Sequence, residues 1–162
     1  MTRRAGIPYK VGDWFAVPLR DGKGYALGRI ARAAPRGKII FCYFFGPPLD
    51  KVPKLDRIPE VSPQNAVFVA RCGDLGLIKG DWPIIGSSHW DPDEWKMPQF
   101  SRTESISGAT YEVTYRENDP SSEVSEQRID KASPTGLPEN DLFGYGAVEI
   151  RLTKLLRKGP GT

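Results

Sequence analysis

The chain of 162 residues carries 23 Lys and Arg against 20 Asp and Glu, a net charge of +3, with basic clusters only at its two ends. A dedicated nucleic-acid-binding protein usually has a basic patch even when its net charge is small. No such patch is evident between the two ends, so this class of protein is not favoured. The 17 Gly and 15 Pro exclude a coiled coil or long helical bundle and favour short strands joined by turns, while an apolar fraction of 39% is enough for a core.

The first part of the chain predicts a meander of three antiparallel strands. These strands are residues 12–19, 25–32 and 38–45. Asp21-Gly22 marks a tight turn between the first two, and Gly46-Pro47-Pro48 is expected to end the third. Gly28, inside the second strand, indicates a bulge or a close backbone approach. The bent meander looks like the beginning of a small barrel of the SH3 kind.

The middle of the chain alternates loops and short strands. Residues 50–63 are polar and rich in proline, which predicts a surface loop. Further strands are predicted at residues 65–72, 82–86 and 111–116. Residues 89–102 are too interrupted by proline for regular structure, yet too aromatic for a solvated linker.

The last part combines a polar segment with a helix. Residues 117–138 are rich in Ser, Glu and Pro and are expected to be the most flexible stretch, with a ribbon strand around 124–129 left open. Residues 144–158 predict an amphipathic helix, because apolar side chains recur at helical spacing. A strand over residues 148–152 is the alternative, but the pattern is long and Gly159-Pro160 is a normal helix stop.

Together these elements predict a β-rich α+β fold in a single domain, residues 1–162, with a core from about residue 9 to 157. The architecture would be a bent antiparallel sheet or a partial SH3-like barrel with one C-terminal helix packed on it. Cys42 and Cys72 each lie in an apolar run, which predicts buried free thiols. No apolar run reaches the roughly 20 residues of a membrane span, and no apolar segment follows the N-terminal arginines, so we expect a cytoplasmic protein.

Three segments resemble the immunity protein 26 family in their order and spacing. Residues 11–19, followed by 21–22 and 25–30, resemble the opening of that family. Gly80-Asp81-Trp82-Pro83-Ile84-Ile85-Gly86, followed by Pro98-Gln99-Phe100, resembles its middle segment, and residues 144–149 resemble its closing helix. The resemblance spans about residues 9–156.

The resemblance implies a bacterial protein that binds and neutralises a cognate toxin of a polymorphic toxin or contact-dependent inhibition system. Binding alone would suffice, so no cofactor is expected. The family label is shared with a HocA-type phosphotriesterase, which supplies a second hypothesis, a small phosphotriesterase-like hydrolase. The family offers no established catalytic residue to carry over.

The candidate partner-binding residues lie in the aromatic, acidic loop. They are Trp90, Asp91, Asp93, Glu94 and Trp95. Tryptophan is enriched at interface hot spots, and carboxylates here and at Asp50, Asp56 and Glu60 would steer the protein toward a toxin with a basic cleft. The alternative for the aromatic side chains is that they belong to the core and cover an open end of the sheet, and this interpretation is favoured for Trp82 and Phe100. The alternative for the acidic side chains is an ordinary solvated loop.

Two other functions remain open from the sequence. The single histidine, His89, lies beside the acids of the same loop and is the candidate base of a hydrolase. A metal-activated water usually needs more ligands than this segment offers. We therefore assign no catalytic residue and no metal ligand. Alternatively, Tyr25, Phe41, Tyr43 and Phe45 beside Arg29 and Arg32 would be stacking platforms of a nucleic-acid or peptide-binding barrel. We favour core roles for these aromatics and expect no nucleic-acid partner.

Overall fold

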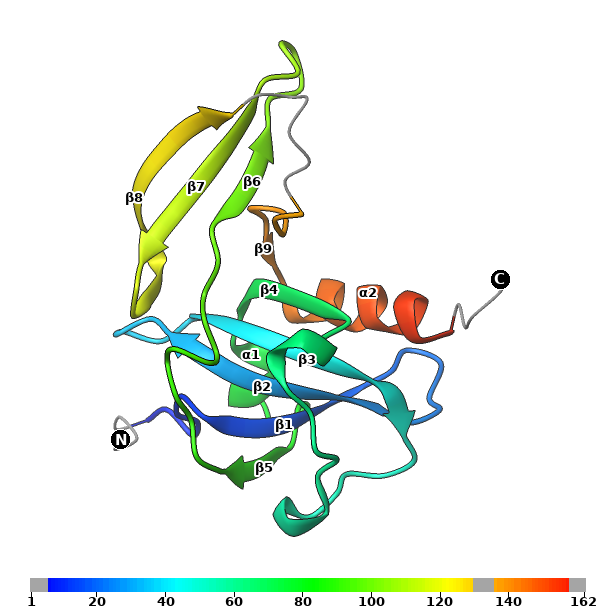
Figure 1. The fold of residues 1–162 in the computed structure, drawn as a ribbon. Helices are drawn as coiled ribbons and strands as arrows, with labels where there is room; N and C mark the ends of the chain where they lie inside the picture. Colours follow the sequence, from blue (N-terminus) through cyan, green and yellow to red (C-terminus); the bar gives the residue numbers. More distant parts are fainter. Residues whose placement is uncertain (1–5, 130–135, 158–162) are drawn as a thin grey trace.

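The computed structural model describes residues 6–129 and 136–157 of the chain (Figure 1). Its strands are β1 (Asp13–Pro18), β2 (Tyr25–Ala33), β3 (Ile39–Leu49), β4 (Phe68–Gly73), β5 (Ile84–Ser87), β6 (Phe100–Thr103), β7 (Thr110–Arg116), β8 (Asp119–Ile129) and β9 (Leu142–Phe143). The helices are α1 (Leu75–Ile78) and α2 (Tyr145–Arg157), with 3-10 turns η1 (Leu55–Arg57) and η2 (Pro63–Asn65) between β3 and β4. Within this described part, no helix has the length and hydropathy that a membrane crossing requires.

The strands form two open sheets. The main sheet has the order β5-β1-β2-β3-β4-β9 and is antiparallel except for the short parallel pairing of β4 with β9. The second sheet, β6-β7-β8, is antiparallel and projects away from the main sheet (Figure 1). The predicted β-rich class with one C-terminal helix is confirmed, and among the described strands no closed barrel forms.

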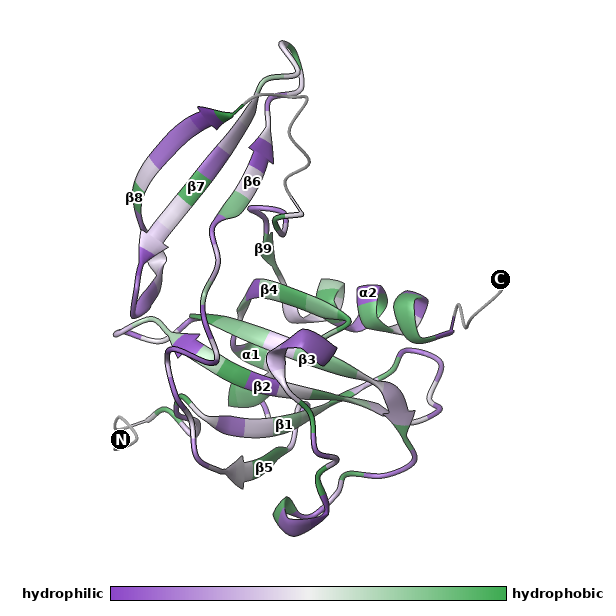
Figure 2. Cartoon of the chain, in the orientation of Figure 1, coloured by the Kyte–Doolittle hydropathy of each residue, from purple (hydrophilic) through white to green (hydrophobic). Residues whose placement is uncertain are grey.

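Both faces of the main sheet are buried, because its central strands carry apolar side chains on both sides. One face packs against α2 and Trp82 in a cluster that includes Phe15, Ile30, Phe44, Val148 and Leu152. The opposite face packs against the β5–β6 loop and the second sheet, in a cluster that includes Trp14, Phe41, Phe45, Trp95, Phe100 and Val113. Figure 2 shows hydrophobic residues along β3 and β4 and mostly hydrophilic residues along β8.

β4 and β5 begin three and two residues later than expected, and three further boundaries differ from the sequence expectations. β3 does not end at Gly46 but continues to Leu49, because an irregularity in its pairing with β2 lets Leu49 lie opposite Tyr25. Residues 100–103, expected to be irregular, form β6 because each of them pairs with β7. β8 begins at Asp119, before the expected ribbon strand, and residues 130–135 of the segment expected to be flexible lie outside the described residues.

Gly28 confirms the expected close approach within β2. A Cβ atom on Gly28 would lie 2.5 Å from Cζ of Phe15, on the paired strand β1. The Phe15 ring is fully buried and stacks on Trp82 with ring centroids 5.4 Å apart. Only glycine leaves room for this ring above the β2 backbone.

A buried carboxylate fastens α2 to the main sheet. Glu149 is 7% exposed, and its two oxygens accept hydrogen bonds from Trp82 Nε1 at 2.9 Å and from Arg20 Nε at 2.7 Å. Val148 and Leu152 of the same helix are fully buried in the apolar cluster beside it. The helix is therefore held by apolar packing and by one carboxylate that satisfies two donors.

We expect Glu149→Gln to lower the free energy of unfolding by about 1–3 kcal/mol, because the amide nitrogen cannot accept and leaves Trp82 Nε1 or Arg20 Nε without its partner. Urea denaturation followed by tryptophan fluorescence measures this change. Glu123→Gln, at an exposed position of β8, is the matched control and should change stability by less than about 0.5 kcal/mol. Equal stability of the two variants would show that the Glu149 carboxylate does not fasten the helix.

Candidate functional site

The loop of residues 88–95, here called the acidic loop, follows β5 and lies on the face of the main sheet opposite α2. Its main chain is held by Arg29 of β2, which is 2% exposed. Arg29 Nη2 donates to the carbonyl oxygens of Ser88 and His89 at 2.9 and 2.8 Å, and Nε donates to the Gly12 carbonyl at 3.2 Å. The start of the loop is therefore fixed by a charge-assisted contact with the sheet.

Arg32, also on β2 and 1% exposed, holds the other end of the acidic loop. Its Nη1 donates to the Trp95 carbonyl at 2.7 Å and its Nη2 to the Pro92 carbonyl at 3.2 Å. Its Nε donates to the Glu117 carbonyl at 2.7 Å, so the same side chain also fixes the turn between β7 and β8. Two buried guanidinium groups thus replace the strand pairing that this segment lacks.

The two arginines also stack on the aromatic residues of this face. The Arg29 guanidinium lies 4.5 Å from the ring centroid of Trp14 and 4.7 Å from that of Trp95. The Arg32 guanidinium lies 5.1 Å from the Trp90 ring. Cation–π contacts of desolvated guanidinium groups are favourable. Arg32 Nη2 also forms an ion pair with the Glu117 carboxylate.

The five predicted partner-binding residues occupy different depths. Asp93 and Glu94 are exposed, and Trp90 and Asp91 are half-buried. Asp91 shapes the turn, because its Oδ1 accepts from the Asp93 amide at 2.9 Å and its carbonyl accepts from the Trp95 amide at 2.9 Å. The carboxylates that face solvent most fully are therefore those of Asp93 and Glu94.

Trp95 is a core residue that lines the base of a pocket. It is 2% exposed and makes edge-to-face contacts with Trp14 at 5.8 Å and Tyr43 at 5.2 Å between ring centroids. Trp82 and Phe100 are both fully buried, which confirms the core interpretation favoured for them from the sequence. Any contact of Trp95 with a partner must therefore be made through the pocket.

The pocket, here called the junction pocket, forms where the proline-rich loop of residues 50–63 meets the acidic loop. It encloses about 320 Å³. Its lining residues are Trp14, Arg29, Leu55, Ile58, Pro59, Glu60, Val61, Ser88, Glu94 and Trp95. The fold thus brings together Glu60 and Glu94, from two acidic segments that lie apart in the sequence, while Asp50 and Asp56 are exposed elsewhere on the first loop.

The electrostatics of the junction pocket centre on Arg29. Burial lowers the pKa of the Arg29 guanidinium to about 10, and the charges of Glu94 and Asp13 oppose this shift. The group therefore stays protonated at neutral pH. Neither Glu60 nor Glu94 forms an ion pair with any described residue, so both carboxylates remain available to a ligand.

The residues of the hydrolase hypothesis are not organised as a catalytic site. His89 is exposed, and across residues 6–129 and 136–157 its imidazole makes no hydrogen bond. The hydroxyl of the neighbouring Ser88 accepts from Trp14 Nε1 at 2.8 Å and Arg29 Nη2 at 3.2 Å. In the same described residues, no group of three His, Cys, Asp or Glu side chains is placed to hold a metal ion.

Of the four stacking platforms of the nucleic-acid hypothesis, Tyr25 is half-buried at the start of β2 and the other three are core residues. Phe41, Tyr43 and Phe45 are all buried beneath the acidic loop and the second sheet, and the Tyr43 hydroxyl donates to the Lys96 carbonyl. The Arg29 and Arg32 guanidinium groups are buried beside them. These side chains cannot stack on bases in this fold.

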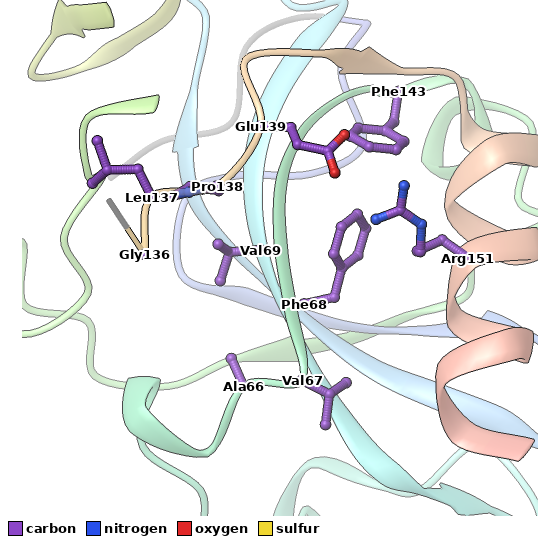
Figure 3. A pocket seen from close by; sticks show the side chains of 10 residues that line it. All are labelled: Ala66, Val67, Phe68, Val69, Gly136, Leu137, Pro138, Glu139, Phe143 and Arg151. Carbon is purple, nitrogen blue, oxygen red and sulfur yellow. The ribbon is translucent and has the colours of Figure 1, made fainter. Parts of the chain in front are cut away.

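A second pocket of about 320 Å³ lies between the outer edge of β4, residues 136–139, β9 and α2 (Figure 3). Phe68 and Phe143 meet edge to face with centroids 5.3 Å apart, and the Arg151 guanidinium lies 5.3 and 5.2 Å from their rings. Glu139 lines the same pocket, and Figure 3 shows its carboxylate pointing toward Phe143.

Sequence reasoning missed the arrangement around Arg29. It treated Arg29 as part of a possible nucleic-acid surface and gave no role to Trp14 or to the apolar residues Leu55, Ile58 and Val61. One signal was present: Arg29 shares a strand face with Leu27, and a charged residue on an apolar face requires buried partners. The identity of those partners depends on tertiary contacts alone.

The structure shows a β-rich fold in which buried arginines hold an acidic loop beside a small pocket. The chain belongs to the immunity protein 26 family, whose model matches residues 10–112. The match covers the main sheet from β1 to β5, the acidic loop, β6 and the start of β7, whereas α2 and the resemblance noted at residues 144–149 lie outside it. Neither a curated protein nor a solved structure gave a significant match.

Proposed function

We propose that the protein is an immunity protein that binds a cognate bacterial toxin in the cytoplasm of the producing cell and blocks it without catalysis. Membership of the immunity protein 26 family is the observation that carries this proposal. Binding alone is sufficient for neutralisation, and the protein would need neither a metal nor an organic cofactor for it.

The toxin-binding surface that we propose consists of the acidic loop and the facing part of the proline-rich loop. It presents Asp93, Glu94 and Glu60 as exposed carboxylates, with Trp90 and Asp91 half-buried between them and the sheet. The acidic loop is held by buried arginines, so its exposed groups are presented in one geometry. Little conformational entropy is therefore lost on binding. The carboxylates would steer the surface toward a basic cleft on the toxin.

The direct test is co-expression of this chain with the toxin encoded beside its gene. Rescue of growth, together with co-purification of a complex of defined stoichiometry, is the expected outcome. Unimpaired toxicity in the presence of the folded protein would refute the proposal, and so would rescue without any complex.

We expect the double variant Asp93→Lys, Glu94→Lys to weaken toxin binding by about tenfold or more, mainly through slower association, because the sign of the steering charge is reversed. Surface plasmon resonance at several salt concentrations measures this change, which should shrink as salt screens the charges. The matched control is Glu123→Lys, Asp141→Lys, which makes the same change in net charge at exposed positions on β8 and before β9. Equal losses in both variants would assign the effect to net charge and not to the acidic loop.

A further inference from the structure

The junction pocket contains a buried cation with an unused donor. Arg29 lines the pocket and is 2% exposed. Its Nε and Nη2 atoms donate to Gly12, Ser88 and His89, whereas Nη1 has no hydrogen-bond partner among the described residues. A group in the pocket can therefore accept a hydrogen bond from this charged donor.

Ser88 adds a second donor at the same end of the pocket. Its Oγ accepts from Trp14 Nε1 at 2.8 Å and from Arg29 Nη2 at 3.2 Å, and the hydroxyl proton has no acceptor among the residues that the structure describes. A hydroxyl that already accepts twice has its proton left to donate. The part of the pocket at Arg29 and Ser88 therefore favours a ligand atom that accepts hydrogen bonds.

The opposite requirement holds at Glu60 and Glu94. Glu60 and Glu94 line the pocket, are exposed, and form no ion pair with a described residue. Ionised carboxylates only accept hydrogen bonds, so this end favours a ligand donor. Between the two ends, the wall is apolar and comes from Leu55, Ile58 and Val61. A volume of about 320 Å³ is at the low end for ligand pockets and suits a single side chain.

These requirements exclude simple charged groups. A carboxylate would satisfy Arg29 but would lie beside Glu60 and Glu94, and like charges in contact are unfavourable. An ammonium group would suit the two glutamates but would lie beside the Arg29 guanidinium. A carboxamide satisfies both ends at once, because its oxygen accepts, its nitrogen donates, and it carries no charge.

We propose that the junction pocket binds the side-chain carboxamide of a glutamine or asparagine on the partner protein. The carboxamide oxygen accepts from Arg29 Nη1 and the Ser88 hydroxyl, the amide nitrogen donates to Glu60 or Glu94, and the aliphatic stem packs on Leu55, Ile58 and Val61. That the group belongs to a toxin rests on the proposed function. The chemistry of the pocket does not, and it is tested on the protein alone.

The test is a titration of the isotope-labelled protein with three small molecules that carry the end group of one side chain and no further amide, followed by NMR of the indole N–H signals. They are propionamide, propionate and butylammonium, here called the glutamine, glutamate and lysine probes. Trp14 reports on the pocket, because its Nε1 donates to Ser88 Oγ. Trp82 is the internal control, because its Nε1 donates to Glu149 on the opposite face of the sheet. We expect saturable shifts of the Trp14 signal with the glutamine probe, at an affinity about fivefold or more above that for either charged probe.

An isosteric pair of substitutions makes the inference falsifiable without loss of fold. In Glu60→Gln, Glu94→Gln, the repulsion toward a carboxylate is gone, so the glutamate probe should now bind at least as tightly as the glutamine probe. Glu123→Gln, Asp141→Asn, at exposed positions outside the pocket, is the matched control and should keep the original selectivity. The proposal is overturned if the Trp14 signal responds equally to all three probes, responds to none, or moves only together with Trp82.

This experiment separates the two proposals. Selective binding of the glutamine probe without rescue of growth would leave the carboxamide site standing and remove the immunity function. Rescue of growth without a selective response at Trp14 would leave the immunity function standing and remove the carboxamide site.

Discussion

Arg32→Ala is expected to lower the free energy of unfolding by about 3–5 kcal/mol, the largest effect of any single substitution considered for this protein. The guanidinium is 1% exposed and donates to the carbonyl oxygens of Ala31, Pro92, Trp95 and Glu117. Its removal leaves these acceptors without their donor at a buried position, at a cost of about 1–3 kcal/mol for each one that water cannot reach. Chemical denaturation monitored by circular dichroism measures the loss.

The matched control is Arg128→Ala on β8, where the side chain is exposed and the expected change is within about 0.5 kcal/mol. A second variant, Arg32→Lys, keeps the charge but loses the planar fork, so it should recover only a small part of the stability. In the Arg32→Lys variant, backbone amide hydrogens across residues 92–95 and at the β7–β8 turn should exchange faster than in the parent protein. Full stability of Arg32→Lys would show that charge, and not the set of carbonyl contacts, holds the acidic loop.

The second large effect is expected at Gly28. Gly28→Ala should destabilise the fold by about 3 kcal/mol, because the added methyl carbon would lie 2.5 and 2.6 Å from two ring carbons of Phe15. Phe15 cannot withdraw, since its other face stacks on Trp82 at 5.4 Å and its edge meets Phe44 at 5.9 Å. Thermal unfolding followed by calorimetry provides the measurement.

Gly73→Ala serves as the control, because Gly73 also lies in a strand of the main sheet and the nearest atom to a Cβ there is the Lys38 carbonyl oxygen, at 3.8 Å. It should leave the melting temperature nearly unchanged. The double variant Gly28→Ala, Phe15→Leu separates the clash from a backbone effect. A smaller side chain at position 15 should make the Gly28 substitution less costly than it is in the parent, and additive losses would contradict the steric explanation.

Much of the fold was predictable because it is encoded locally. Period-two alternation identified β2 and β7, apolar runs between turns identified β1 and β4, and apolar residues at helical spacing identified α2. β6 was not predictable, because Phe100 to Thr103 follow a proline-rich stretch and are strand only by pairing with β7. The continuation of β3 to Leu49 likewise depends on its partner strand, which no local pattern reveals.

The candidate site was predictable in position but not in organisation. Residue types alone placed an acidic, aromatic segment near residue 90, and the exposed Asp93 and Glu94 agree with an accessible surface there. Depth was not predictable: Trp90 and Trp95 have similar sequence surroundings, yet Trp95 packs against Trp14 and Tyr43 while Trp90 is half-buried. The meeting of Glu60 with Glu94 is a property of the folded chain, because 34 positions separate them in the sequence.

The way in which the acidic loop is fastened has a consequence for how such a protein can diversify. Arg29 and Arg32 hold main-chain oxygens of Ser88, His89, Pro92 and Trp95, atoms that every amino acid supplies. Exchange of Asp93 or Glu94 therefore leaves the fastening intact. New recognition properties can arise by substitution at these outward positions, while the scaffold beneath them keeps its shape and stability.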